Sequence, residues 1–272
     1  MVVADLGGSV DGDGASSTPA DDVVAEITKA GGEAVACYAS VADADGAASI
    51  VQTALDAFGR LDVVINNAGI SGPDLFEDLS LDHFRRMVDV HYLGTVYMVR
   101  AAWPHLREAG YGRIVNTCSE GMLGIHQKIT GYGGAKAGVF GLTRNLATEG
   151  PKHGILVNAV APRARTRMSD AATMSKVFDV PAEDIEGVMG DFPPEQVSPV
   201  AVFLAHESCS LNGEVLVAGG GQVMRLAVFE TRGITNPNLT PEAVAESLDD
   251  ILDLTDPQLF AVQTAIDLHS QS

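Results

Sequence analysis

Three side chains within residues 117–138, TCSEGMLGIHQKITGYGGAKAG, have the types needed to move a proton to or from an alcohol. Tyr132 and Lys136 are four residues apart, so on a helix they project from the same face. A phenol has an ordinary pKa of about 10, and a neighbouring cation such as Lys136 favours its ionised form. Ser119, thirteen residues before Tyr132, could donate a hydrogen bond to a carbonyl oxygen. A Tyr–Lys pair at this spacing also occurs on ordinary helix edges, so its meaning depends on the surrounding motifs.

Short β-branched segments alternate with longer helical patterns, and these elements must position the three side chains. The expected strands are 1–4, 33–38, 61–66, 112–117, 155–160 and 214–219. The expected helices are 19–30, 43–58, 80–109, 131–150 and 193–206, with Ser80 as an N-cap and with Gly110 and Gly150 near helix ends. Strands that are apolar throughout and alternate with helices predict a parallel sheet covered on both faces, which is a doubly wound α/β fold.

A sheet of this kind binds its ligands at the carboxyl ends of the strands. Five strands end there in the following residues: Asp5, Ser40-Val41, Asn66 to Gly69, Cys118-Ser119 and Ala161-Pro162. Asp5 follows the apolar run MVVA and precedes a glycine turn. In nucleotide-binding folds an acid at this point holds the adenosine ribose.

The composition limits the partners that we expect. The chain has 17 Lys and Arg against 36 Asp and Glu, and its net charge of −19 repels phosphate backbones and anionic lipid surfaces. Nucleic acid and membrane are therefore not expected partners, and no stretch reaches the roughly 18 apolar residues of a membrane helix. Cys37, Cys118 and Cys209 are too few and too scattered for a disulfide framework or a zinc site. We therefore expect a cytoplasmic protein. We also expect no metal, because the segment DGDG at 11–14 is not followed by the Glu that ends a calcium-binding loop.

Several motifs, taken in chain order, resemble the short-chain dehydrogenase/reductase family. They are INNAG at 65–69, the spacing from Ser119 to Tyr132, YGGAK at 132–136 and VNAVAP at 157–162. Through ADLGG, VHYLG and YGRIV the chain also resembles the dehydrogenase module of peroxisomal multifunctional enzyme type 2 and its actinobacterial single-module relatives. The resemblance implies a Rossmann-type domain over residues 1–221 that interconverts a secondary alcohol and a ketone with NAD. It also implies a 3-hydroxyacyl-CoA or 17β-hydroxysteroid-like small-molecule substrate, and a homodimer or homotetramer.

The resemblance implies a role for each site residue. Tyr132 is the catalytic acid/base, Lys136 lowers its pKa and holds the nicotinamide ribose, and Ser119 binds the substrate oxygen. His91 stands where most of the family has a proton-relay Asn, and it is either a relay or a packed histidine. Asp5 favours NAD over NADP because a carboxylate repels a 2′-phosphate. Tyr132 is also an implied cofactor contact, and the others are Ser40, Val41, Asn67, Ala68, Gly69, Ala164, Arg165, Thr166 and Arg167.

Arginines follow the strand at 155–160, where the family usually has a glycine after the proline. Arg163, Arg165 and Arg167 fall within five residues of a chain that is poor in positive charge. They form either a solvated loop or a site in which at least one guanidinium binds a phosphate of the cofactor or of coenzyme A.

The family's first strand and its Gly-rich phosphate turn would stand before Met1. Two explanations are open. The sequence starts at an internal Met of a longer protein, which predicts stabilisation by NAD, or the chain is a cofactor-free relic that acts as a binding or scaffold protein.

Residues 222–272 form a C-terminal extension beyond the minimal family fold. TPEAVAESLDDILDL, residues 240–254, has apolar residues at helical spacing and predicts a docked helix. This helix would cover the substrate mouth, build a dimer contact or cap the core. The loop 163–192, rich in Met and Ala, is a candidate substrate lid.

Overall fold

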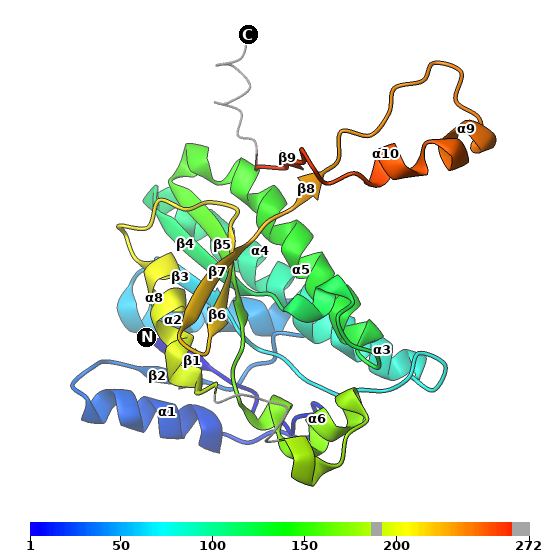
Figure 1. Ribbon diagram of the computed structural model, residues 1–272. Coiled ribbons are helices and arrows are strands. Elements are labelled where there is room, and N and C mark those ends of the chain that lie inside the picture. The colour runs from blue at the N-terminus through cyan, green and yellow to red at the C-terminus, as the bar shows by residue number, and fades with distance from the viewer. Residues whose placement is uncertain (186–191, 263–272) are drawn as a thin grey trace.

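Two sheets lie side by side between layers of helices in the computed structural model, which describes residues 1–185 and 192–262 (Figure 1). The larger sheet has the order β3-β4-β5-β6-β7, and its strands are β3 Val63–Asn66, β4 Gly112–Thr117, β5 Ile155–Pro162, β6 Val215–Gly219 and β7 Gln222–Leu226. The strands β3 to β6 are parallel, and β7 returns antiparallel to β6. The smaller sheet pairs β1 Val2–Ala4 in parallel with β2 Val35–Cys37. The predicted doubly wound α/β fold is confirmed.

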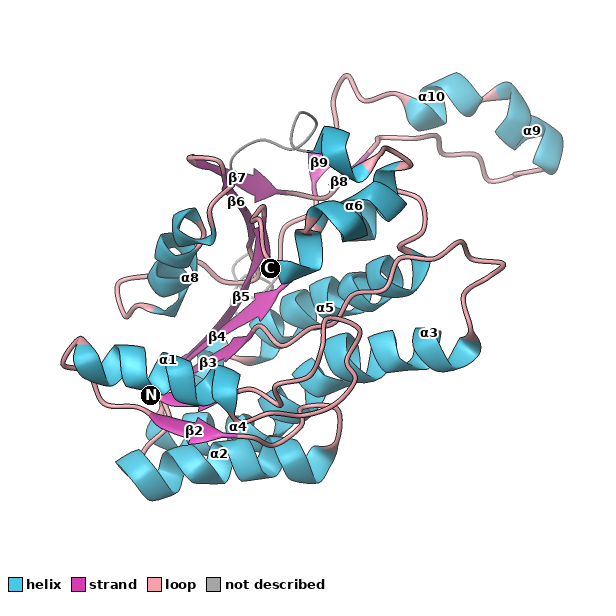
Figure 2. Cartoon of the chain, turned by 90° about the horizontal axis from the view of Figure 1, so that it is seen from below, coloured by secondary structure: helices cyan, strands magenta, loops and turns pink. Residues whose placement is uncertain are grey.

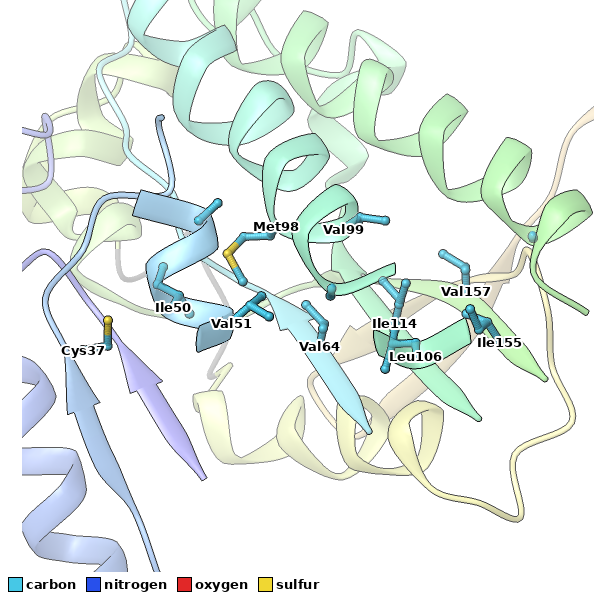
Figure 3. Close-up of a cluster of buried hydrophobic side chains, with 13 residues drawn as sticks. Cys37, Ile50, Val51, Val64, Met98, Val99, Leu106, Ile114, Ile155 and Val157 are labelled. Carbon is cyan, nitrogen blue, oxygen red and sulfur yellow. The ribbon is translucent and has the colours of Figure 1, made fainter. Parts of the chain in front are cut away.

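Helices cover both faces of the sheets (Figure 2). One face carries α2 Ala44–Phe58, α4 Gly94–Ala109 and α5 Thr130–Glu149, and the other carries α1 Thr18–Lys29 and α8 Ser198–Ala205. The main core lies between the sheets and the first of these layers, where Leu106, Ile114, Ile155 and Val157 are fully buried (Figure 3). Because this cluster also includes Cys37 of β2 and several residues of α2, the helix layer joins the two sheets.

A gap separates β1 from β3. Among the described residues β1 pairs only with β2 and β3 pairs only with β4, so each sheet has an unpaired edge facing the other. Ile65 in the middle of β3 is 48% exposed, which is unusual for a central position in such a sheet. The strand that the family pattern places at this point is not among the described residues.

The helix predicted over 80–109 is interrupted. Ser80 caps it as expected, since its side chain accepts a hydrogen bond from His83 N, and α3 Leu81–Met87 follows. A π-helical turn, η1 Val88–Leu93, then leads into α4, which ends at Gly110 in the left-handed conformation. Single π-helical turns inside a helix are often found at functional sites, and this one contains His91.

The C-terminal extension contains the predicted helical segment as two short helices, α9 Pro241–Glu246 and α10 Leu248–Leu252. Neither has a buried residue, and both lie away from the sheets and their covering helices (Figure 1). The apolar residues Val244, Leu248 and Leu252 are exposed, so the expected docking of this segment on the core is not observed. A short antiparallel pair, β8 Phe229–Glu230 and β9 Gln258–Leu259, closes the base of this segment, and residues 263–272 lie outside the described part.

Within the described ranges, no helix combines the length and apolar character needed to cross a bilayer. Over the same ranges, no three His, Cys, Asp or Glu side chains are grouped as a metal site requires.

Candidate active site

A single large cavity of about 1730 Å³ runs from the end of β1 to the start of α5. It lies at the carboxyl ends of the parallel strands, as the fold predicts. Its walls include all but one of the candidate residues: Asp5, Ser40, Val41, Asn67, Ala68, Gly69, His91, Ser119, Tyr132, Lys136, Ala164, Thr166 and Arg167. Arg165 does not line it; the backbone N–H of this residue donates to Phe192 O. Residues as far apart in the sequence as Asp5 and Arg167 thus line one cavity.

Ser119 and Tyr132 come together because a short turn packs on the first turns of α5. Ser119 follows β4 and caps the 3-10 turn η2 Glu120–Leu123, its Oγ accepting a hydrogen bond from Gly121 N at 3.1 Å. A Cβ added at Gly133 of α5 would lie 2.7 Å from Gly121 O, so the two backbones are in close contact. Burial raises the pKa of Tyr132 above its ordinary value, and a hydrogen bond with Ser119 lowers it in part.

Lys136 is almost completely buried, and its Nζ donates to Thr117 O at 2.6 Å. Burial lowers its pKa to about 8. Its Nζ lies 5.7 Å from the centroid of the Tyr132 ring. Desolvation is the largest influence on the pKa of Tyr132 in this structure, and the expected lowering of that pKa by Lys136 stays a prediction.

His91 lies under the loop that follows β3. Its Nε2 is 2.9 Å from Ile70 O and 3.2 Å from Ile70 N, and its ring meets that of Tyr132 edge-on at 5.1 Å between centroids. A Cβ added at Gly69 would lie 2.6 Å from His91 Cε1, so the NNAG turn needs a glycine here. Burial and the charge of Lys136 lower the pKa of His91 to about 3, so the ring is neutral at physiological pH. Its Nδ1 is buried without a hydrogen-bond partner in the described part of the chain.

The residues predicted to contact a cofactor are held in place by local hydrogen bonds. Asp5 follows β1, and its carboxylate accepts from Gly7 N at 2.6 Å. Ser40 Oγ accepts from Ala42 N, and Asn67 Oδ1 accepts from Thr117 Oγ1 at 3.2 Å. On the other side of the cavity, Thr166 caps the turn η4 Arg167–Ser169.

Arg163 has a partner within the protein. Its Nε and Nη2 each lie 2.7 Å from a carboxylate oxygen of Glu120. This bidentate ion pair gives the Arg163 guanidinium a partner within the protein. Binding of a phosphate by at least one of the three arginines stays a prediction.

The candidate lid is tied to the loop before α5. The helix α6 Ala171–Phe178 ends at Asp179, whose carboxylate forms an ion pair with Lys128 and accepts a hydrogen bond from Gln127. The ring of Phe178 meets that of His126 edge-on at 4.9 Å. Residues 186–191 of the predicted lid fall outside the described residues.

Three residues that contribute to the site were not singled out from the sequence. Thr117 accepts from Lys136 and donates to Asn67, and Asn116 joins β3 to α5 through hydrogen bonds with Asn66 and Thr143. Asn116 and Thr117 could have been found from the sequence, because they are the polar pair that ends the apolar segment GRIVNT. Glu120 carried no comparable signal, because its partner is 43 residues away.

Residues 4–175 match the family described as short chain dehydrogenase. The chain belongs to this family. It is 46% identical over 234 residues to the short-chain type dehydrogenase/reductase Rv0148 of Mycobacterium tuberculosis, with 86% of this chain and 78% of that protein covered. The crystal structure of a short chain dehydrogenase from Mycobacterium avium superimposes with a TM-score of 0.74 at 35% identity, covering 92% of this chain and 85% of the other.

The same dehydrogenase family includes part of a larger relative. Over 259 residues the chain is 38% identical to the peroxisomal multifunctional enzyme type 2 of Mus musculus. The matched region covers 94% of this chain but only 33% of that protein. The chain thus spans about a third of the multifunctional enzyme. Membership of the short-chain dehydrogenases supports an oxidoreductase that uses a nicotinamide cofactor, and it does not favour the alternative of a cofactor-free binding or scaffold protein.

Proposed function

We propose that this short-chain dehydrogenase interconverts a secondary alcohol and a ketone with NAD. The observation that carries the proposal is the placement of Ser119, Tyr132 and Lys136 on one wall of a single large cavity. In the oxidation direction the phenolate form of Tyr132 takes the hydroxyl proton and becomes the neutral phenol, while Ser119 donates a hydrogen bond to the substrate oxygen. Lys136, buried and bonded to Thr117 O, holds a positive charge beside them. When bound, NAD supplies the hydride acceptor.

The residues of the cavity fit a nicotinamide cofactor at both of its ends. Asp5 stands at the end of β1, where its carboxylate suits the ribose hydroxyls of the adenosine half, and Lys136 suits those of the nicotinamide half. The carboxylate of Asp5 would also repel the 2′-phosphate of NADP, which supports NAD. His91 would relay a proton as a neutral imidazole, since its pKa of about 3 keeps it uncharged.

The substrate side of the cavity supports an apolar alcohol. Met168, Met174, Val177 and Phe178 of the lid line it, with Ile125 and Ile129 opposite. A 3-hydroxyacyl-CoA or a 17β-hydroxysteroid-like alcohol fits these walls, and the names of the relatives include a 3-oxoacyl-[acyl-carrier-protein] reductase. Arg167 also lines the cavity and would meet a phosphate of coenzyme A. We expect the enzyme to act as a homodimer or homotetramer.

Replacement of Tyr132 by Phe tests the reaction. Turnover of 3-hydroxyacyl-CoA and 17β-hydroxysteroid substrates, followed by the nicotinamide absorbance, should fall at least about 100-fold, because general acid–base catalysis contributes on this scale. NAD binding should change little, since the variant lacks only the hydroxyl. Near-full activity of Tyr132→Phe would show that the proposed mechanism is wrong.

Replacement of Asp5 by Ala tests the choice of cofactor. The ratio of kcat/KM for NAD to that for NADP should fall at least about 10-fold, equivalent to about 1.4 kcal/mol, because the variant no longer repels a 2′-phosphate. An unchanged ratio would mean that Asp5 does not determine the preference for NAD over NADP.

A further inference from the structure

The ion pair between Glu120 and Arg163 lies next to Ser119 and takes no part in the proposed reaction. It joins the turn after β4 to the residue that follows β5, and both side chains line the cavity. Two parallel N–H···O bonds of 2.7 Å make this one of the stronger kinds of ion pair. The Arg163 guanidinium holds the pKa of Glu120 below its ordinary value, so the pair is ionised at neutral pH.

Arg163 is itself fixed to the sheet. Its backbone N–H donates to Ala218 O of β6 at 2.7 Å, directly after the last residue pair of β5 and β6. The guanidinium therefore projects from a point that the sheet holds in place. Glu120, which pairs with this guanidinium, is therefore held in a fixed position relative to the sheet.

Glu120 is the first residue of η2, the turn that Ser119 caps. On one side η2 contacts the backbone of α5, through Gly121 and Gly133. On the other side its only ion pair among the described residues is the one with Arg163. The orientation of Ser119 toward Tyr132 thus depends on a turn held between α5 and the end of β5.

We propose that Glu120 and Arg163 are positioning residues that hold η2 so that Ser119 faces Tyr132 and the substrate oxygen. The part that concerns the substrate rests on the proposed function. The part that concerns Tyr132 rests on the packing of η2, where a Cβ added at Gly121 would lie 3.3 Å from Ser119 Oγ and 3.4 Å from Tyr132 Cε1. A misplacement of a substrate-binding group by about 1 Å can lower a rate about 100-fold, so a positioning pair can matter without touching substrate.

Glu120→Gln and Arg163→Met in the full 272-residue chain test the proposal. Each should lower kcat about 10-fold or more with little change in the KM for NAD, and the exchanged pair Glu120→Arg with Arg163→Glu should recover part of the loss. A second readout needs no activity. The ionisation of Tyr132, measured as the phenolate absorbance that is lost in a matching Tyr132→Phe protein, should move to higher pH as the Ser119 hydrogen bond weakens.

Glu214→Gln is the matched control. Glu214 forms the same bidentate geometry with Arg225, with distances of 2.7 and 2.6 Å, and neither residue lines the cavity. A general loss of stability should affect Glu214→Gln and Glu120→Gln alike, whereas only Glu120→Gln should change kcat and the Tyr132 titration. The proposal is overturned if Glu120→Gln and Arg163→Met leave that titration unchanged, or if Glu214→Gln shifts it equally. If the unaltered chain transfers no hydride while the titration shifts as expected, the proposed function fails and the positioning role stands.

Discussion

Burial controls the ionisation of the side chains around Tyr132. It lowers the pKa of Lys136 to about 8 and that of His91 to about 3, and it raises the pKa of the Cys118 thiol to about 12. All three changes favour the neutral form, as desolvation requires. Lys136 still carries its charge at neutral pH, and it is the cation available to the reaction.

The pKa of His91 predicts an acid-sensitive stability. In the unfolded chain a histidine binds a proton below about pH 6.5, whereas folded His91 does so only near pH 3. Between these values the unfolded state binds more protons, so stability is lost as the pH falls. From about pH 7 to about pH 5 this residue should lower the free energy of unfolding by about 2 kcal/mol.

His91→Asn is the variant that isolates this effect. Urea unfolding at the two pH values should show a smaller loss for the variant, because Asn does not titrate. Lys136 is protonated in both states over this range and contributes no difference. Equal losses in the two proteins would mean that folded His91 takes up a proton as easily as the unfolded chain.

The spacing of Ser119, Tyr132 and Lys136, read together with the motifs around them, predicted these three as site residues, and all three line one cavity in the structure. These three residues lie at the end of β4 and on α5, so the position of the strand end and the period of the helix determine which side chains come close together. The pair of Glu120 and Arg163 was not predictable in the same way. It depends on the register of β4 against β5, which brings together residues 43 positions apart.

At the scale of elements, the π-helical turn η1 places His91 against the loop that follows β3. An uninterrupted helix over 80–109 would follow from its apolar pattern, and it would give His91 a different rotation about the axis. Because the ring is fixed by Ile70 and by Tyr132, it has no room to move away from Gly69. No residue in the local sequence predicts a π-helical turn at 88–93. We attribute the turn to the tertiary contacts of His91 with Ile70 and Tyr132.

Gly69→Ala tests this packing. The added methyl group would meet His91 Cε1 at 2.6 Å, and the strain should lower stability by about 1–3 kcal/mol. In a His91→Ala background the same substitution should cost much less, because the clashing ring is gone. Gly134→Ala on α5, with no atom within 4 Å of its added Cβ, should be neutral or stabilising and serves as the control. An equal cost of Gly69→Ala in both backgrounds would exclude the His91 contact as its cause.

At the scale of the whole molecule, the cavity separates two sheets of very different size. Every residue of β4 is buried, whereas β1 and β2 share three residue pairs and have Cys37 as their one buried residue. The small sheet is joined to the rest by the core contacts of α2 and by the loop 6–16, where Ser71 N donates to Val10 O and Arg86 pairs with Asp13. No β-ladder hydrogen bonds connect the two sheets in the described part of the chain.

This arrangement predicts that the two sheets open separately. Backbone amides of β1 and β2 should exchange with solvent at least about 100-fold faster than those of β4 and β5, which corresponds to a local opening about 3 kcal/mol less costly. Hydrogen exchange read by mass spectrometry measures both sheets in one experiment. Saturating NAD should slow exchange in β1 and β2 toward the rate of the larger sheet, because a ligand that spans the cavity binds only when both sheets are closed. Asp5→Ala should weaken that protection, and equal exchange in the two sheets without NAD would mean that they already open as one unit.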